Sequence, residues 1–187
     1  FLIDNNLFLS SHGMWDMSEG GAYAHNLFAG RFRIHPELRR ETPYHPAHAT
    51  SIAGLKNITG GDNRFLNNLF VSLPDLSPYD KAANPMHMAG NVYLGGAKPS
   101  KHESNALVQP QNDPGMQLIQ KPDGIYLTIK QDDAWSQQQR PLVTTELLGK
   151  AKVPDLPYVK PDGTAYRIDT DYLGQPRDTD NPSPGPF

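Results

Sequence analysis

The stretch that decides the fold is Asp4-Asn5-Asn6-Leu7-Phe8-Leu9-Ser10, because the chain repeats it. It returns as Ala24-His25-Asn26-Leu27-Phe28-Ala29-Gly30 and as Leu66-Asn67-Asn68-Leu69-Phe70-Val71-Ser72, and a weaker copy is Ala89-Gly90-Asn91-Val92-Tyr93-Leu94-Gly95. The central asparagines are separated by steps of 20 (6 to 26), 42 (26 to 68) and 23 (68 to 91) residues. The middle step is about twice the others, so it contains either one unmarked coil or a long insertion.

A unit of about 20 residues with two short apolar strands around an asparagine cannot bury its apolar face alone, so such units stack. This pattern predicts an all-β protein built as a parallel β-helix, with neighbouring strands roughly 4.8 Å apart. Asn6, Asn26 and Asn68 would then lie on one line, each amide bonding the next. Either the leucine or the phenylalanine that follows each asparagine would stack inward. Antiparallel hairpins in a sandwich are the alternative, but they do not explain the period and the apolar register together.

Composition limits the classes of protein. The chain has 187 residues, of which 37% are hydrophobic and 20% charged, and its 16 glycines and 18 prolines favour a turn-rich β protein. The net charge of −3 argues against a nucleic-acid partner, and no apolar run reaches the ~20 residues of a membrane span. There is no cysteine, so the sequence indicates neither the redox compartment nor the localisation. A homo-oligomer is possible. The chain begins with Phe1 and not with methionine, and the repeat is already under way by Asn5, so we expect a fragment of a longer protein.

Two regions are expected. Residues 1–96 would form the coils, with a loop insertion at residues 31–50, and Thr50–Ile58 is the candidate for the unmarked coil. Residues 97–187 would form an irregular, β-rich extension that caps or covers the stack. Within it we expect a loop at Lys98–Asn112, strands at Met116–Gln120, Ile125–Lys130 and Leu142–Leu148, and one helical turn at Ala134–Arg140.

The first group of candidate site residues lies in the loop after the first copy of the repeat: His12, Trp15, Asp16 and Glu19. Two carboxylates one coil apart would sit near the strand spacing of ~4.8 Å, close to the ~5–5.5 Å of a retaining glycosidase. Trp15 would offer a flat apolar face to a sugar ring. The alternative is that Asp16 and Glu19 are solvated loop acids and that Trp15 packs on the edge of the core.

The second group lies in the insertion and comprises Arg40, Glu41, Tyr44, His45 and His48. Arginine can fork to a carboxylate, tyrosine can stack or donate, and histidine can bond hydroxyls. Glu41, His45 and His48 are alternative candidates for metal ligands, but Pro43 and Pro46 argue against a single helical face that would hold them. We therefore predict no metal and no cofactor. His25, at a repeat position, is expected to cap a turn.

Several of these stretches resemble a known family. Phe1–Ser10, Ser18–Gly30, Thr42-Pro43-Tyr44-His45 with His48, and Pro141–Lys150 are similar to the carboxy-terminal part of glycoside hydrolase family 120, the β-helix β-xylosidases. This resemblance implies a right-handed parallel β-helix that releases xylose from short xylo-oligosaccharides with retention. It also implies an aspartate nucleophile and a glutamate acid/base.

In that family both catalytic carboxylates precede the segment that matches Phe1. The resemblance therefore implies that the chain lacks them, that it is inactive alone, and that its partner is the missing amino-terminal part of the same protein. If the alignment is shifted by one coil, Asp16 and Glu41 are the fallback pair. The chain would supply one wall of the oligosaccharide site through His12, Trp15, Glu19, Arg40, Glu41, Tyr44, His45 and His48.

Two other functions fit the same scaffold. A polysaccharide lyase would use calcium and a basic residue against a uronic acid, and Arg31, Arg33, Arg39 and Arg40 are available, but no cluster of aspartates is. A non-catalytic carbohydrate-binding or structural β-helix is the other alternative.

Overall fold

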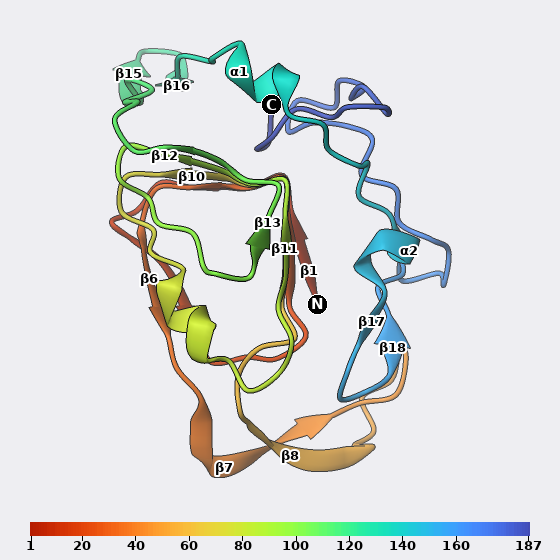
Figure 1. The fold of residues 1–187 in the computed structure, drawn as a ribbon. Helices are drawn as coiled ribbons and strands as arrows, with labels where there is room; N and C mark the ends of the chain where they lie inside the picture. The colour runs from red at the N-terminus through yellow and green to blue at the C-terminus, as the bar shows by residue number, and fades with distance from the viewer.

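Two five-stranded parallel sheets form the centre of the molecule in the computed structural model, which describes residues 1–187 (Figure 1). The first contains β1 (Leu2–Asp4), β4 (Ala22–Ala24), β9 (Arg64–Leu66), β11 (His87–Ala89) and β13 (Glu103–Ser104). The second contains β2 (Leu7–Phe8), β5 (Leu27–Phe28), β10 (Leu69–Val71), β12 (Val92–Leu94) and β14 (Leu107–Gln109). The chain alternates between the sheets, and we call each traverse of both a pass. The all-β class and the parallel pairing are confirmed, so the antiparallel sandwich is wrong.

The corner between the two sheets is made by the repeated asparagines. The residue before each central position has a left-handed backbone: φ is 54° at Asn5, 53° at His25, 56° at Asn67 and 69° at Gly90. Asparagine and glycine adopt this conformation at little cost. The predicted role of His25 at a turn is therefore confirmed, since it takes the same backbone conformation as the asparagines it replaces.

The central asparagines form the ladder that the repeat predicts. The Oδ1 atoms of Asn26, Asn68 and Asn91 accept hydrogen bonds from the side-chain amides of Asn6, Asn26 and Asn68, at 3.3, 3.1 and 3.0 Å. Each of these oxygens also accepts the backbone N–H of the preceding asparagine, at 2.9, 2.9 and 2.8 Å. The ladder satisfies buried polar groups that a tight corner would otherwise leave without partners.

The aromatic residue two positions after each central asparagine points inward. Phe8, Phe28, Phe70 and Tyr93 stack in one row, with ring centroids 4.7, 5.4 and 4.8 Å apart. The leucine row, which includes Leu27 and Leu69, faces outward and is covered by later segments such as Trp135. Of the two alternatives for the inward row, the phenylalanines are therefore correct.

The 42-residue step is an insertion and not an extra coil. Leu27 of β5 pairs directly with Leu69 of β10, so nothing stands between the second and third passes in that sheet. The inserted segment contains β6 (Arg31–Ile34), which pairs in parallel with β3 (His12–Asp16), and a projecting antiparallel hairpin of β7 (Glu37–Tyr44) and β8 (Gly54–Ile58) (Figure 1). The expectation of a coil at Thr50–Ile58 is wrong, because its apolar residues pair with the outgoing strand of the hairpin.

The segments after Gly96 differ in part from expectation. Within Lys98–Asn112, expected as a loop, β13 and β14 add a fifth pass. The hairpin of β15 (Gln117–Lys121) and β16 (Gly124–Thr128) and the short helix α1 (Ala134–Gln137) were predicted correctly. The strand expected at Leu142–Leu148 is wrong: helix α2 (Thr145–Leu148) forms there, because the Thr144 hydroxyl accepts the Leu147 N–H and caps it.

The rest of the chain runs along the outside of the stack (Figure 1). It contains the pair β17 (Lys150–Ala151) and β18 (Leu156–Pro157), and a 3₁₀ helix, η1 (Ser77–Lys81), lies earlier, after the third pass. Val143, Leu148, Tyr158 and other apolar residues of this part pack against the first sheet at Ala22 and Ala24. None of the helices has the length and apolarity needed to span a bilayer.

Candidate functional site

A cleft of about 390 Å³ opens on the side of the stack opposite the asparagine corner, between the end of β3–β6, the end of β8 and η1. Its lining includes Asp16, His35, Thr59 and Tyr79. These residues come from three different passes or their connections, so the cleft exists only when the passes are stacked.

Asp16 lies at the floor of the cleft and is 5% exposed. Its Oδ1 accepts hydrogen bonds from the Ser18 N–H (3.0 Å) and hydroxyl (2.6 Å). Its Oδ2 accepts one from the Asn63 side-chain amide (2.8 Å) and a short one from the Tyr79 hydroxyl. Four donors therefore surround the carboxylate, which orients it and leaves neither oxygen without a protein partner.

Tyr79 brings the 3₁₀ helix η1 to this carboxylate. Burial raises the pKa of the Tyr79 phenol well above its usual value, and the neighbouring Asp16 charge raises it further. The phenol is therefore neutral and remains a donor to Asp16 at physiological pH. Tyr79 connects the third pass to the first, and its ring forms part of the cleft wall.

Glu19 holds the segment after β8 in place through its carboxylate. Its Oε1 alone accepts hydrogen bonds from the Thr59 N–H (2.5 Å) and hydroxyl (2.6 Å), the Gly60 N–H (2.9 Å) and the Asn84 amide (3.2 Å). The carboxylate thus holds the end of β8, whose Thr59 and Gly60 line the cleft. Glu19 positions the wall of the cleft rather than lining it.

Trp15 and His35 form the outer rim. The Trp15 indole N–H donates to Nε2 of His35 at 2.8 Å, and the two rings are 5.9 Å apart. Trp15 is 63% exposed, and the Arg33 guanidinium lies 5.7 Å from its ring centroid. The ring is therefore accessible to a ligand, and the alternative that Trp15 packs on the core edge is not what the structure shows.

A bulge in β3 places His12 beside Trp15. The register shifts between His12 and Met14, so Gly13 is the extra residue and His12 pairs with Arg31 while Trp15 pairs with Arg33. A side chain at Gly13 would meet the Gly30 carbonyl oxygen at 2.9 Å, so glycine is required. His12 and Trp15 consequently lie on the outer face of this strand pair, whereas Asp16 points inward.

The second group of sequence-predicted residues lies on the β7–β8 hairpin. Arg40 and Glu41 are exposed, and neither side chain makes an ion pair within the chain. His45 Nδ1 lies 2.9 Å from the Ser51 carbonyl oxygen, and the Tyr44 ring packs over Gly54. His48 faces a separate hollow, with Phe1 and Tyr158. None of the five lines the Asp16 cleft, so the hairpin and the cleft are distinct places on the chain.

The fallback carboxylates are not brought together. Asp16 is inside the cleft on β3, and Glu41 is on the solvent-exposed hairpin, outside the cleft lining. No group of three or more histidine, aspartate or glutamate side chains is arranged to hold a metal ion.

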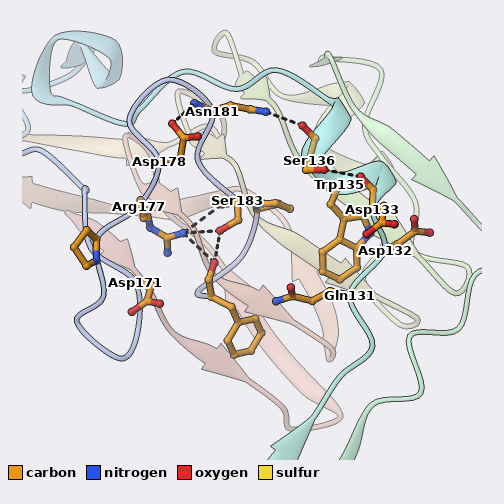
Figure 2. Close-up of a pocket in the computed structure, with 13 residues that line it drawn as sticks. Gln131, Asp132, Asp133, Trp135, Ser136, Asp171, Arg177, Asp178, Asn181 and Ser183 are labelled. Atoms are coloured by element: carbon orange, nitrogen blue, oxygen red, sulfur yellow. Dashed lines mark hydrogen bonds between the residues drawn. The ribbon is translucent and has the colours of Figure 1, made fainter.

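Another pocket, of about 290 Å³, lies between α1 and the carboxy-terminal tail (Figure 2). Arg177 lies on its wall and donates to the Thr170 and Gly185 carbonyl oxygens and to the Asn5 side chain (2.7 Å). Burial lowers the pKa of this guanidinium to about 10, which leaves it charged at neutral pH. These bonds attach the carboxy-terminal tail to Asn5, at the corner of the first pass. We therefore interpret the pocket as a space left where the tail packs on the stack, and not as a ligand site.

Sequence reasoning missed His35, Asn63 and Tyr79. His35 lies 20 residues after Trp15, the same step as between the first two asparagines, so the repeat period carried the signal. No such signal existed for Tyr79, which reaches Asp16 across 63 residues from a proline-rich connection.

A search of solved structures finds the complex of XylC with xylose, at a TM-score of 0.90 and 29% sequence identity. The similarity covers 100% of this chain and 34% of that one, so the chain spans about a third of the length of XylC. No protein-family model matches the chain, and no curated protein matches it.

Proposed function

We propose that the chain is part of a glycoside hydrolase that acts on xylosides, a β-xylosidase-like enzyme that releases xylose from xylo-oligosaccharides by a retaining two-carboxylate mechanism. The observation that carries this proposal is the similarity along the whole chain to the complex of XylC with xylose, at 29% identity. It agrees with the sequence resemblance to the β-helix β-xylosidases of glycoside hydrolase family 120.

The fold supports this proposal at a finer level. We propose that the passes are coils of a right-handed parallel β-helix, a proposal supported by the parallel pairing in both sheets and by the asparagine ladder. We further propose that residues 1–96 form the coils with the insertion at 31–50, and that residues 97–187 form an extension whose first strands add the last pass and whose remainder covers the outside of the sheets.

The catalytic pair belongs, in this proposal, to parts of the enzyme outside this chain. A retaining enzyme needs two carboxyl groups about 5–5.5 Å apart. In this chain Asp16 is held by four donors and Glu41 is on a different element. Asp16 is then a positioning residue that fixes η1 and the floor of the cleft, and the fallback pair of Asp16 and Glu41 is the weaker alternative.

The sugar-binding wall is proposed to be the cleft with its rim at Trp15 and His12. An exposed indole face packs on the C–H face of a pyranose ring, and the rim histidines bond hydroxyls. Glu19 contributes by holding Thr59 and Gly60 in the wall. Arg40, Glu41, Tyr44, His45 and His48 would contact substrate only where the hairpin meets another part of the enzyme.

The first pass offers the surface on which that other part would stack. β1 and β2 are the last strands of their sheets on this side, so their outer edges have no partner in the chain. A hollow of about 340 Å³ lies on the same side, lined by Phe1, Ile3, Phe8 and other apolar residues. A preceding coil of the same protein would satisfy this edge and cover these side chains.

The test is to clone the full-length gene from which the chain derives and to assay its product and residues 1–187 side by side on an aryl β-xyloside. We expect turnover by the full-length protein, retention of anomeric configuration, and no turnover by residues 1–187. Turnover by residues 1–187 would move the catalytic carboxylates into this chain and onto Asp16 and Glu41. Absence of turnover by the full-length protein on xylosides would refute the proposed function.

A further inference from the structure

The outer face of the β3–β6 pair carries an aromatic and basic surface that begins at the rim of the cleft and extends beyond it. We call it the outer strip, and it consists of His12, Trp15, Arg31, Arg33 and His35. All five side chains are exposed. They are brought together by the parallel pairing of two strands and by the bulge at Gly13.

The positive charge on this strip is not neutralised by the chain. Neither the Arg31 nor the Arg33 guanidinium belongs to any of the five ion pairs of the molecule. The chain as a whole has a net charge of −3, so two unpaired arginines on one small face form a local excess of positive charge. The Arg33 guanidinium lies over the exposed ring of Trp15, 5.7 Å from its centroid.

An exposed aromatic ring next to two unpaired arginines favours binding of an acidic saccharide over a neutral one. A flat exposed indole packs on a sugar ring, and an arginine beside it offers the fork of N–H donors that matches a carboxylate. Arg31 and Arg33 are two residues apart on one strand, so their Cα atoms are roughly 6.6 Å apart and both point outward. A neutral sugar would pack on the indole ring but would leave both guanidinium charges without an ion-pair partner.

We propose that the outer strip is a binding site for the uronic acid of an acidic xylo-oligosaccharide, with Trp15 under the sugar ring and Arg33 and Arg31 on its carboxylate. The strip is continuous with the cleft, because His35 lines the cleft and accepts the hydrogen bond of Trp15. This inference rests on the proposed function, since it names the substituent that a xyloside in the cleft would place on the rim.

The experiment measures binding of three ligands to the full-length protein that contains residues 1–187, by titration calorimetry. The ligands are an unsubstituted xylo-oligosaccharide, the same oligosaccharide carrying glucuronic acid, and the methyl ester of the second. The acid and its ester differ only in the carboxylate charge. We expect the acid to bind about tenfold more tightly than the ester, as a charge-assisted fork to arginine provides.

Three variants assign the effect. Arg33→Gln should remove most of the preference for the acid, with Arg31 keeping the remainder, and leave the affinity for the ester unchanged. Trp15→Ala should weaken both. The control is Lys121→Gln, which removes another exposed cation that lies over an aromatic ring, Tyr126, at 4.4 Å on the β15–β16 hairpin, and it should change neither affinity.

Equal affinity for the acid and the ester would overturn the proposal, and so would an equal loss in Arg33→Gln and Lys121→Gln. Failure of all three ligands to bind would overturn it as well. Failure of this inference is distinguishable from failure of the proposed function, because the latter is decided by turnover of a neutral aryl xyloside by the full-length protein. An acid preference without xyloside turnover would leave the strip in place and refute only the xylosidase.

Discussion

The two sides of the stack follow different rules. At the asparagine corner the first four passes repeat one another, with a residue in the left-handed conformation, an asparagine of the amide ladder and an aromatic ring behind it. On the opposite side each pass differs: the first carries β3, the second β6 and the β7–β8 hairpin, and the third η1. The cleft and the outer strip both lie on that variable side.

The difference has a physical cause. At the corner each side chain satisfies backbone groups of its neighbour, so a change in one pass affects two others. On the opposite, variable side, single residues such as Asp16 and Glu19 hold the connections between passes through hydrogen bonds. The connecting segments can therefore differ in length from one pass to the next. Stability should therefore be concentrated at the corner and binding on the opposite side.

The largest expected effect is that of Asn68→Ala. This buried side chain donates to the Tyr23 carbonyl oxygen (2.9 Å) and to Asn91 (3.0 Å), and accepts from Asn26. Its removal leaves several buried groups without partners, and we expect the free energy of unfolding to fall by about 4 kcal/mol. Asn6→Ala at the exposed end of the ladder is the matched control and should cost about 1 kcal/mol. Equal costs in urea denaturation would contradict the ladder's role.

The far end of the ladder gives a pH-dependent effect of about 3 kcal/mol. Glu103 Oε2 accepts from the Asn91 amide and the Tyr93 hydroxyl, and burial raises the pKa of this carboxyl to about 7. The folded state then binds a proton that the unfolded state, with a pKa near 4.5, has released, so this group stabilises the fold below about pH 4.5 and the contribution is lost as the pH rises through 7.

Glu103→Gln should remove this loss, because an amide oxygen can accept the same two bonds without a charge. Burial lowers the pKa of His25 to about 3, so this histidine destabilises the fold as the pH falls below 6.5, and it opposes Glu103 between pH 4.5 and 6.5. The variant must therefore be compared with the parent at each pH. The difference in free energy of unfolding, variant minus parent, should rise from pH 4.5 to 8. A constant difference would refute this assignment.

On the variable side, Asp16→Asn should cost about 2 kcal/mol. All four partners of this carboxylate are donors, so an amide group would place its own N–H₂ against two of them. Glu19→Gln is the matched control: only Oε1 of Glu19 accepts bonds, an amide oxygen can replace it, and the cost should stay below about 1 kcal/mol. Thermal or urea unfolding of the two variants tests this, and a larger cost for Glu19→Gln would be the contrary result.

The asparagine corner was predictable from sequence because one residue type carries the whole geometry. The period of the repeat predicts the parallel stack, the asparagine ladder and the position of His25 at a turn. The fifth pass was missed because Ala106 follows Asn105 where the other passes have an asparagine. Glu103 takes over the last bond of the ladder there, and nothing in its local sequence marks that role.

The site was predictable only where its residues follow the period. His12, Trp15 and Asp16 were expected together in a loop, whereas the structure places them on one strand, β3. Their division between the outer face and the cleft floor depends on a bulge that no sequence pattern indicates. Tyr79 and Asn63 reach Asp16 from other passes, and such long-range contacts are set by the stacking and not by any motif. The role of the hairpin residues stays a prediction.

The smallest expected effect on stability is that of Arg33→Gln, although Arg33 is central to the proposed binding of an acidic ligand. Arg33→Gln on the outer strip breaks no ion pair, so the free energy of unfolding should change by no more than about 0.5 kcal/mol. Arg64→Gln is the contrasting variant, because this arginine is 4% exposed and donates to Asp62 and to the Leu148 and Lys150 carbonyl oxygens. Breaking that buried network should cost about 3 kcal/mol or more. If Arg33→Gln destabilised the chain as much as Arg64→Gln, the strip would be part of the scaffold, and the separation between a structural side and a binding side would fail.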